Sequence, residues 1–358
     1  MTVLSYPPSD LERWREAFSG TTALVTGGAG FIGSHLVDAL AAAGARVRVL
    51  DDLSNGRREN LTRHLGAHHG GGAGGGSASP VELTVGDIRD AETCRRLAEG
   101  ARWVFHQAAL GSVPRSMKTP ALTLDVNVGG TAQVLTAARD AGVERIVYAS
   151  SSSVYGSSQT LPKREGEEGD PLSPYALSKK MNEELMEVYG RCFGQEIIGL
   201  RYFNVYGPRQ DPRGPYAAVV PLFFDAYREG RAPRIHGDGE QARDFTFVAD
   251  AVAANLGAAL APAESCGRAY NVGAGGSTTI NRLARRIREL AGGGPEPEHG
   301  PPRPGDVRFS LADVSAAREA FGYRPRTSIE EGLGITAASY LKPSRSEPRR
   351  GEPIEAGG

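Results

Sequence analysis

A tyrosine and a lysine four residues apart form the pair in this sequence best suited to moving a proton. They are Tyr175 and Lys179, in the segment SPYALSKKMNEELM. On a helix this spacing puts both side chains on one face, so the ammonium is predicted to lie close to the phenol. A nearby positive charge favours the phenolate and moves a pKa of about 10 towards neutral pH. We therefore expect Tyr175 to be a general base assisted by Lys179.

Serine hydroxyls lie at the end of an apolar run upstream of that pair. The run RIVYAS leads into Ser151, Ser152 and Ser153. A serine at the end of a strand, opposite the tyrosine, can hydrogen-bond an oxygen that is being oxidised and help to pass its proton. A Tyr and Lys pair taken alone is more often an ordinary surface pair. Its catalytic interpretation therefore depends on what else the sequence contains.

A glycine-rich turn near the N-terminus predicts a dinucleotide site. The segment ALVTGGAGFIGSHLVDAL places Gly27, Gly30 and Gly33 between a predicted strand and a predicted helix. Glycine allows a tight turn and close approach of a pyrophosphate, which the helix N-terminus then binds. The next predicted strand ends in Asp51 and Asp52, where a carboxylate accepts hydrogen bonds from the adenosine ribose. Such a carboxylate repels a 2′-phosphate, so NAD is favoured over NADP.

The elements that must hold these residues alternate in type along the first half of the chain. Apolar runs of strand length are followed by longer segments of helical periodicity. This pattern is typical of a parallel sheet with helices on both faces, so the fold class is α/β with a Rossmann-type doubly wound sheet. Asp87 follows the third strand, where it is expected to meet the adenine. Strands are expected at 22–26, 46–50, 81–85, 102–106, 145–150 and 196–203, and helices at 9–18, 31–43, 57–65, 91–99, 121–141 and 175–193.

Composition shifts suggest the domain boundaries. Residues 1–20 read as a helical extension and residues 21–200 as the NAD-binding domain, with a Gly-rich insertion at 66–80. Residues 201–342 are expected to form mainly a smaller α/β substrate domain, with some segments returning to the first domain. Residues 343–358 read as a disordered tail.

Charge and cysteine content exclude several classes of function. The 41 Lys+Arg and 42 Asp+Glu residues leave a net charge of −1, so we expect neither nucleic acid nor a membrane surface as a partner. No apolar stretch approaches the roughly 18 residues that span a bilayer. The three cysteines, Cys94, Cys192 and Cys266, form no C-x-x-C pair. We therefore expect no metal site and a cytoplasmic location.

From residue 22 to residue 340 the chain resembles the extended short-chain dehydrogenase/reductases, and within them the nucleotide-sugar 4-epimerases. The motifs that carry this resemblance are TGGAGFIG, GDIRD, HQAALGSVPRS, SSSVYG, YALSK, LRYFNVYGPRQ and GDVRFSLADVS. The motifs HQAALGSVPRS and FNVYGPRQDPRGPYAAVVP are most similar to those of bacterial UDP-N-acetylglucosamine 4-epimerases. The resemblance implies an enzyme that oxidises C4 of a UDP-sugar with bound NAD and then reduces it from the other face. It also implies a homodimer formed through the helices expected at 121–141 and 175–193.

The resemblance assigns roles residue by residue. Ser151, four residues before Tyr155 of the VYG motif, takes the place of the catalytic serine, and Tyr175 with Lys179 matches the Tyr-x-x-x-Lys pair. The motifs of the resemblance add further residues to the expected cofactor site: Phe31, Ile32, Ile88, Gln107, Ala108, Ala109 and Tyr202. The expected substrate site comprises Gly111, Ser112, Ser151, Ser152, Asn204, Ala218, Val219, Arg243, Arg303, Asp306 and Ser310. In that site Asn204, Arg243, Arg303 and Asp306 would bind the diphosphate and the uridine ribose.

The resemblance also narrows the substrate. Ser310 takes a position where epimerases restricted to UDP-glucose carry a bulky tyrosine, and Ala218 is also small. The room this leaves favours UDP-N-acetylglucosamine and UDP-N-acetylgalactosamine, with plain hexoses tolerated. A uronate 4-epimerase, of UDP-N-acetylglucosaminuronate or UDP-glucuronate, is the main alternative, because Arg115 is available for a C6 carboxylate. A 4,6-dehydratase is disfavoured because Ser152 and Ser153 stand where it carries acids, and an inactive NAD-binding protein because Tyr175 and Lys179 are present.

Overall fold

The computed structural model describes residues 4–65, 79–213, 217–302 and 308–341. Most of the expected Gly-rich insertion at 66–80, the expected tail at 343–358, and two expected substrate contacts, Arg303 and Asp306, lie outside the described residues.

A parallel sheet of seven strands forms the centre of the larger lobe within the described residues. Its strand order is β3-β2-β1-β4-β5-β6-β9, so the order reverses between β1 and β4, the usual place for a dinucleotide in such sheets. The expected α/β fold with a Rossmann-type sheet is confirmed. The strands are β1 (Thr22–Thr26), β2 (Arg46–Asp51), β3 (Val81–Val85), β4 (Trp103–His106), β5 (Arg145–Ser151), β6 (Glu196–Tyr202) and β9 (Arg268–Val272).

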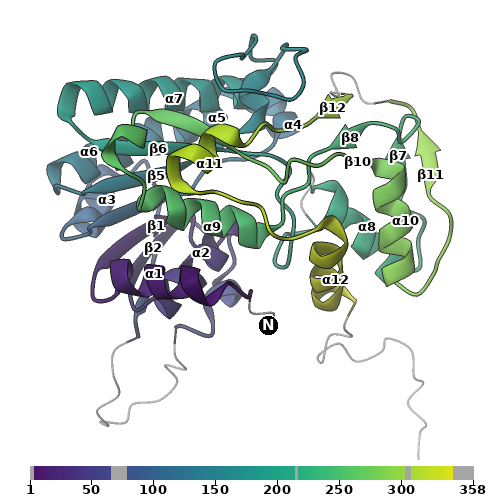
Figure 1. Cartoon of the computed structure of the whole chain (residues 1–358), viewed down its shortest axis with the longest axis horizontal. Coiled ribbons are helices and arrows are strands. Elements are labelled where there is room, and N and C mark those ends of the chain that lie inside the picture. Colours follow the sequence, from purple (N-terminus) through teal and green to yellow (C-terminus); the bar gives the residue numbers. More distant parts are fainter. Residues whose placement is uncertain (1–3, 66–78, 214–216, 303–307, 342–358) are drawn as a thin grey trace, which may run out of the picture.

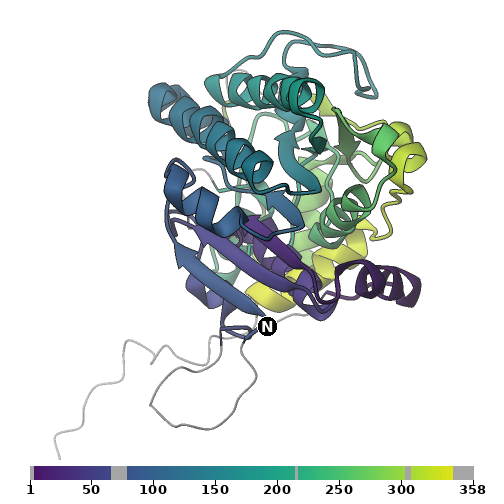
Figure 2. The same ribbon diagram turned by 90° about the vertical axis from the view of Figure 1, so that its left-hand side faces the viewer.

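Helices cover both faces of this sheet, and Figure 2 shows the sheet between the two layers. One layer holds α2 (Phe31–Ala42), α9 (Val248–Ala259) and α11 (Ser315–Phe321). The other holds α3 (Ala91–Ala98), α6 (Gly130–Asp140) and α7 (Pro174–Phe193). The predicted N-terminal helix is present as α1 (Pro8–Phe18), with Trp14 and Phe18 buried.

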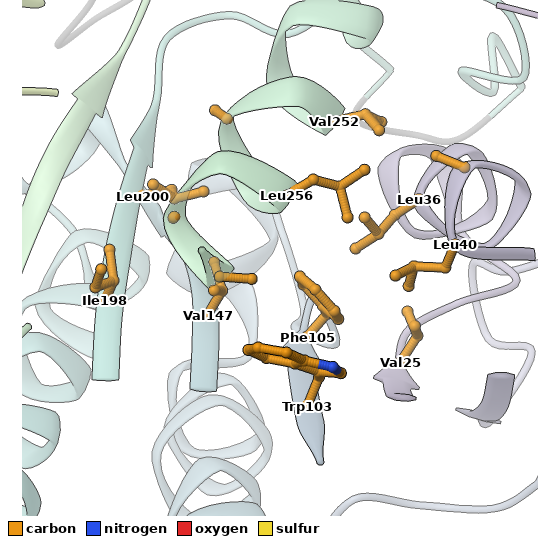
Figure 3. Close-up of a cluster of buried hydrophobic side chains, with 14 of the residues drawn as sticks. Val25, Leu36, Leu40, Trp103, Phe105, Val147, Ile198, Leu200, Val252 and Leu256 are labelled. Carbon is orange, nitrogen blue, oxygen red and sulfur yellow. The ribbon is translucent and has the colours of Figure 1, made fainter. Parts of the chain in front are cut away.

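Apolar side chains fill the space between the sheet and the first helical layer. Leu36 and Leu40 of α2 face Val252 and Leu256 of α9, and all four side chains are fully buried. Strand residues complete the cluster from below, as Figure 3 shows: Val25, Trp103, Phe105, Val147, Ile198 and Leu200. Since β5, β6 and α9 meet here, segments from both halves of the chain build one core.

The smaller lobe is built from short strands and three helices of the described chain. It contains α8 (Val219–Arg228), α10 (Ile280–Leu290) and α12 (Ile329–Tyr340), which pack on one another. Its strands are β7 (Arg234–His236) with β11 (Glu298–Gly300), and β8 (Ala242–Arg243) between β10 (Thr278–Thr279) and β12 (Phe309–Ser310).

Asp244 ties together the segments where the chain passes between the two lobes. It follows β8 and is fully buried. Its carboxylate accepts hydrogen bonds from the backbone N–H groups of Ala274 at 2.8 Å, Gly275 at 3.1 Å and Ala312 at 3.1 Å. Its carbonyl accepts one from Asn204 Nδ2 at 3.1 Å. Burial raises the pKa of Asp244 to about 6.

Two expected helices differ from the structure. Residues 57–65 form only the 3-10 turn η1 (Arg58–Leu61), because Arg57 N and Asn60 Nδ2 both bond Ala29 O in the glycine-rich turn. Residues 121–141 are not one helix. They contain α5 (Pro120–Leu124), the π turn η2 (Asp125–Gly129) and α6, and the unexpected α4 (Val113–Lys118) precedes them. Short 3-10 turns occur at η3 (Ser152–Tyr155) and η4 (Ala263–Ser265).

Candidate active site

The turn between β1 and α2 has the backbone geometry that the glycines predict. A Cβ on Gly27, whose φ is +68°, would lie 2.7 Å from Ala108 N, and a Cβ on Gly33 would lie 2.1 Å from Gly27 O. Neither position accepts a larger residue. The N-cap of α2, Gly30, makes no side-chain cap, so the first N–H groups of this helix face outward. This cradle suits an anion such as the diphosphate of a dinucleotide.

A cavity of about 340 Å³ opens beside this turn, at the carboxyl ends of the strands. Its wall includes every residue that the sequence placed in the cofactor site: Gly27, Gly30, Phe31, Ile32, Gly33, Asp51, Asp52, Asp87, Ile88, Gln107, Ala108, Ala109, Tyr175, Lys179 and Tyr202. Ser54, Asn55 and Gly56 also line it and were not predicted from the sequence. The polar run SNG directly after the acid-ending strand was the signal available for them.

Asp51 forms part of the cavity wall and also fastens it. Its Oδ2 accepts from Ala29 N at 2.9 Å and its Oδ1 from Leu53 N at 2.9 Å. A carboxylate has about four lone-pair sites, so acceptors remain for two ribose hydroxyls. Burial raises the pKa of Asp51. The arrangement fits the ribose of NAD and disfavours a 2′-phosphate.

Asp87, the other acid expected at this site, has its carboxylate bound by Arg89. Arg89 Nε lies 3.0 Å from Asp87 Oδ2, and Arg89 Nη1 reaches Asp125 at 2.6 Å. This hydrogen bonding lowers the pKa of Asp87. Asp87 lines the cavity as a paired acid.

A hydrogen-bonded triangle fixes the cavity wall near Tyr202. Tyr202 Oη donates to Gln107 Oε1 at 3.1 Å, Gln107 Nε2 donates to Asn255 Oδ1 at 2.9 Å, and Asn255 Nδ2 donates to Tyr202 Oη at 2.7 Å. Asn255 lies on α9, which the sequence analysis did not connect with the site. The triangle holds Gln107 and Tyr202 in defined positions.

Tyr175 lies in the first turn of α7 with its phenol in this cavity. Ser173 caps the helix by accepting from Ala176 N at 3.1 Å, which sets where Tyr175 enters the site. Burial raises the pKa of the Tyr175 phenol, and the nearby Ser151 side chain opposes that rise. Ser151 Oγ also accepts from Ser153 N at 3.1 Å. Tyr175 and Ser151 are therefore placed for a shared proton.

Lys179 lies over the Tyr175 ring, as expected, but the expected fall in the pKa of the phenol is not found in the described chain. Lys179 Nζ lies 6.0 Å from the centre of the Tyr175 ring and donates to Ala149 O at 2.7 Å. The pKa of the Tyr175 phenol is raised, because the loss of water around the buried phenol outweighs the other effects. Burial lowers the pKa of Lys179 to about 8, against the opposing charge of Glu183.

A second cavity of about 350 Å³ lies in the smaller lobe. Asn204, Val219 and Arg243, all expected in the substrate site, line it. Ala218 stands beside Val219 as the N-cap of α8. Ser310 pairs with Arg243 across the ladder between β12 and β8. These five residues come together from segments more than 100 positions apart.

Three expected substrate residues lie near the first cavity. Gly111 lines it. Ser112 caps α4 by accepting from Arg115 N at 3.2 Å. Ser152 begins η3, directly after Ser151. Arg115, considered above for a carboxylate on the substrate, donates through Nη2 to Asn55 Oδ1 at 2.9 Å, at the wall that also carries Asp51.

Most of the polar wall of the second cavity was not predicted from the sequence. Arg231, Arg234, His236 and Gln241 line it together with Phe223. Four of these residues lie in the stretch RAPRIHGDGEQAR that leads to Arg243, and its density of basic residues was the signal available. Basic and aromatic groups around one cavity suit an anion attached to a flat ring.

Two searches of the described residues gave negative results. No helix there is both long enough and apolar enough to cross a bilayer. No group of three or more His, Cys, Asp or Glu side chains in those ranges is arranged to hold a metal ion.

Comparison with known proteins identifies relatives over most of the chain. The NAD dependent epimerase/dehydratase family matches residues 23–273. A UDP-glucose 4-epimerase of Mycolicibacterium smegmatis is 41% identical over 324 residues, covering 90% of this chain and 99% of that protein.

Solved structures agree with this match. A UDP-glucose 4-epimerase from Thermotoga maritima, solved with UDP-glucose, superposes with a TM-score of 0.81 at 38% identity and covers 89% of this chain and 98% of its own. A UDP-N-acetylglucosamine 4-epimerase from Methanobrevibacter ruminantium, in complex with UDP-N-acetylmuramic acid, gives 0.82 at 35% identity and covers 90% and 99%.

Proposed function

The chain belongs to the NAD dependent epimerase/dehydratase family, and on that premise we propose that it interconverts UDP-N-acetylglucosamine and UDP-N-acetylgalactosamine. It is an NAD-dependent nucleotide-sugar 4-epimerase. UDP-glucose and UDP-galactose are expected as poorer substrates, since a pocket that admits the larger sugar also admits the smaller one.

The pairing of Ser310 with Arg243 carries this choice of substrate. Arg243 lines the second cavity and its guanidinium is suited to a diphosphate oxygen. Ser310, directly across the ladder, has a small side chain that leaves room for a 2-acetamido group. Ala218 adds no bulk at the start of α8.

In the proposed mechanism, Tyr175 takes the proton of the 4-hydroxyl and Ser151 completes the hydrogen-bond path. The glycine-rich turn and Asp51 would hold NAD, which would supply reversible hydride transfer at C4 and, in its oxidised form, a positive charge in the cavity. Such a charge would favour the phenolate, so Tyr175 would act as a base in the loaded protein. Lys179 would keep its proton and bind the nicotinamide ribose. Arg243 and Asn204 keep the diphosphate in place while the 4-keto sugar turns over.

Proton NMR of the purified protein with UDP-N-acetylglucosamine and no added NAD tests this function. The anomeric signal of UDP-N-acetylgalactosamine should appear with wild type and should be lost in Tyr175→Phe. Its absence, even with NAD added, would rule out the hexosamine substrate. Conversion of the corresponding uronate in the same assay would then support the alternative substrate class.

We also propose that two copies associate through α7 and the neighbouring helices α4 and α5. Seven large apolar side chains are exposed on these helices: Val113, Met117, Leu122, Leu177, Met181, Val188 and Phe193. Such a concentration of exposed apolar side chains suits a protein interface. Val134 of α6 is buried in the core, so in this proposal the 121–141 region contributes through Leu122 of α5. Helix α4, which precedes that region, supplies the neighbouring contacts.

A further inference from the structure

Glu183 is a largely buried carboxylate one helical turn beyond Lys179, and the mechanism above does not use it. Tyr175, Lys179 and Glu183 follow one another at four-residue intervals along one face of α7. The Glu183 side chain is only 12% exposed. Carboxylates are seldom buried to this degree unless they are paired, so the partners of Glu183 indicate its purpose.

Arg201 of β6 binds the Glu183 carboxylate through two of its guanidinium nitrogens, Nε and Nη2. Arg201 Nε donates to Oε1 at 2.9 Å and Nη2 donates to Oε2 at 2.7 Å. Two parallel hydrogen bonds fix the position and orientation of a carboxylate. The third nitrogen, Arg201 Nη1, donates to Tyr155 Oη at 3.1 Å and forms an ion pair with Glu168.

Lys179 and Glu183 fasten α7 to consecutive residues of β5. Lys179 Nζ donates to Ala149 O at 2.7 Å, and Ser150 Oγ donates to Glu183 Oε1. Ala149 and Ser150 both line the first cavity. The carboxylate therefore acts on the same part of the wall as the lysine, at the edge where the proton is transferred.

Two cations, Lys179 and Arg201, share this cluster with the carboxylates of Glu183 and Glu168, and Glu165 also acts on Arg201. A neutral residue in place of Glu183 removes the negative charge that supports the protonated form of Lys179. Arginine does not release its proton in proteins, so the lost charge is met by easier deprotonation of Lys179.

The other titratable groups around Lys179 cannot replace the missing charge. His106 of β4 is neutral, because burial and the charge of Lys179 lower its pKa to about 3. Burial raises the pKa values of Tyr148, Tyr175 and Tyr202, so these phenols are also neutral. Desolvation lowers the pKa of Lys179, and the negative charge of Glu183 acts in the opposite direction.

We propose that Glu183, clamped by Arg201, is a positioning residue that keeps Lys179 charged and seated against β5 at neutral pH. The proposal rests on the role given to Lys179 above, but its test does not require turnover. Because Glu183 touches neither substrate nor cofactor in this account, it acts entirely through Lys179 and Ser150.

Direct titration of the lysines by carbon-13 NMR tests the proposal. The sequence has only five lysines, at positions 118, 163, 179, 180 and 342, so Lys179→Met identifies the signal. In wild type the Lys179 signal should titrate with a midpoint near pH 8, and in Glu183→Gln about 1 unit lower. The control Glu187→Gln, one turn further on α7 and paired with the exposed Arg191, should leave the midpoint unchanged.

Two results would overturn the proposal. One is an unchanged Lys179 midpoint in folded Glu183→Gln. The other is a wild-type midpoint below about 7, which needs no variant and so covers the case in which Glu183→Gln does not fold. An inactive wild type with the expected titration would refute the proposed function and leave this proposal standing.

Enzyme assays supply the second measurement. In Glu183→Gln the alkaline limb of the kcat profile should move down by the same amount as the Lys179 midpoint. Glu183→Asp, which keeps the charge, should restore the limb to within about 0.3 units. A uniform fall of kcat at every pH, without movement of the limb, would show that Glu183 has only a structural role.

Discussion

Ser310 lies directly across the β12 and β8 ladder from Arg243, so a small hydroxyl side chain and a guanidinium share one wall of the smaller lobe. Arg243 has its backbone fixed by this ladder and by the pairing of β8 with β10. The side chain at position 310 therefore determines how much space remains beside a sugar whose diphosphate Arg243 binds.

Ser310→Tyr should change the preferred sugar. The phenol fills the space that we assign to the 2-acetamido group, so kcat/KM for UDP-N-acetylglucosamine is expected to fall roughly 100-fold. The value for UDP-glucose should change by less than about threefold. Rates with each sugar, measured by NMR, check this, with Ser310→Ala as the control for loss of the hydroxyl. Equal losses for both sugars would show that position 310 does not select by size.

Tyr175→Phe should abolish turnover and leave the cofactor in place. Removing a general base typically costs about 10²–10⁴-fold in rate, while the glycine-rich turn and Asp51 are untouched. The absorbance of the protein and the NAD released on denaturation measure cofactor content. Variant protein purified without NAD would indicate that Tyr175 holds the cofactor and would leave its role as a base unsupported.

Met181→Glu should convert the dimer into a monomer. A carboxylate in the middle of the exposed face of α7 would have to be buried unpaired in the proposed interface. Light scattering should give twice the chain mass for wild type and the chain mass for the variant. Val85→Glu is a matched control, because Val85 is also exposed but lies on β3, at the opposite end of the sheet order. A monomeric wild type would refute the proposed interface.

Mild acid should destabilise the fold through two buried histidines. Burial is the main cause that lowers the pKa of His35 to about 4 and that of His106 to about 3. The unfolded chain protonates these residues near pH 6.5, whereas the native chain does not. Their contribution to the free energy of unfolding is therefore fully present above pH 6.5 and is lost as the pH falls. Each histidine should cost roughly 2 kcal/mol of unfolding free energy between pH 7 and pH 5.

Thermal unfolding at a series of pH values measures this loss. His106 is hydrogen-bonded to Thr26 at 2.6 Å and to Thr131 at 2.9 Å, so His106→Asn keeps a polar group there but cannot titrate. The variant should start less stable at pH 7 and lose less stability on acidification. A variant curve parallel to that of wild type would assign the acid sensitivity to other groups.

Local pattern predicted the cofactor side of the molecule well. The spacing of Gly27, Gly30 and Gly33 and the acid at position 51 depend on one strand, turn, helix and strand in sequence order. Each was expected from local periodicity, and the structure brings them to one cavity. Such signals can be predicted because the residues that carry them lie close together in the sequence.

The interruption of the expected helix near Asn127 could not be predicted from the local sequence pattern. Asn127 is fully buried in the π turn, where its side chain holds the backbone of Leu110 at 2.7 Å and the Ser178 hydroxyl at 3.0 Å. The helix distorts to make contacts with residues 17 and 51 positions away, which periodicity does not report. The altered pKa of Tyr175 has the same origin, since burial is a property of the folded chain and not of Tyr-x-x-x-Lys spacing.

Asp244 joins four passages between the lobes into one knot of hydrogen bonds. A hinge movement that separated the two lobes would have to break these hydrogen bonds and leave a buried carboxylate without its N–H partners. The frame around the proposed substrate site is therefore stiff, so in the proposed mechanism inversion at C4 comes from movement of the sugar. In this proposal the binding site stays rigid, and the sugar of the substrate rotates while its diphosphate stays bound.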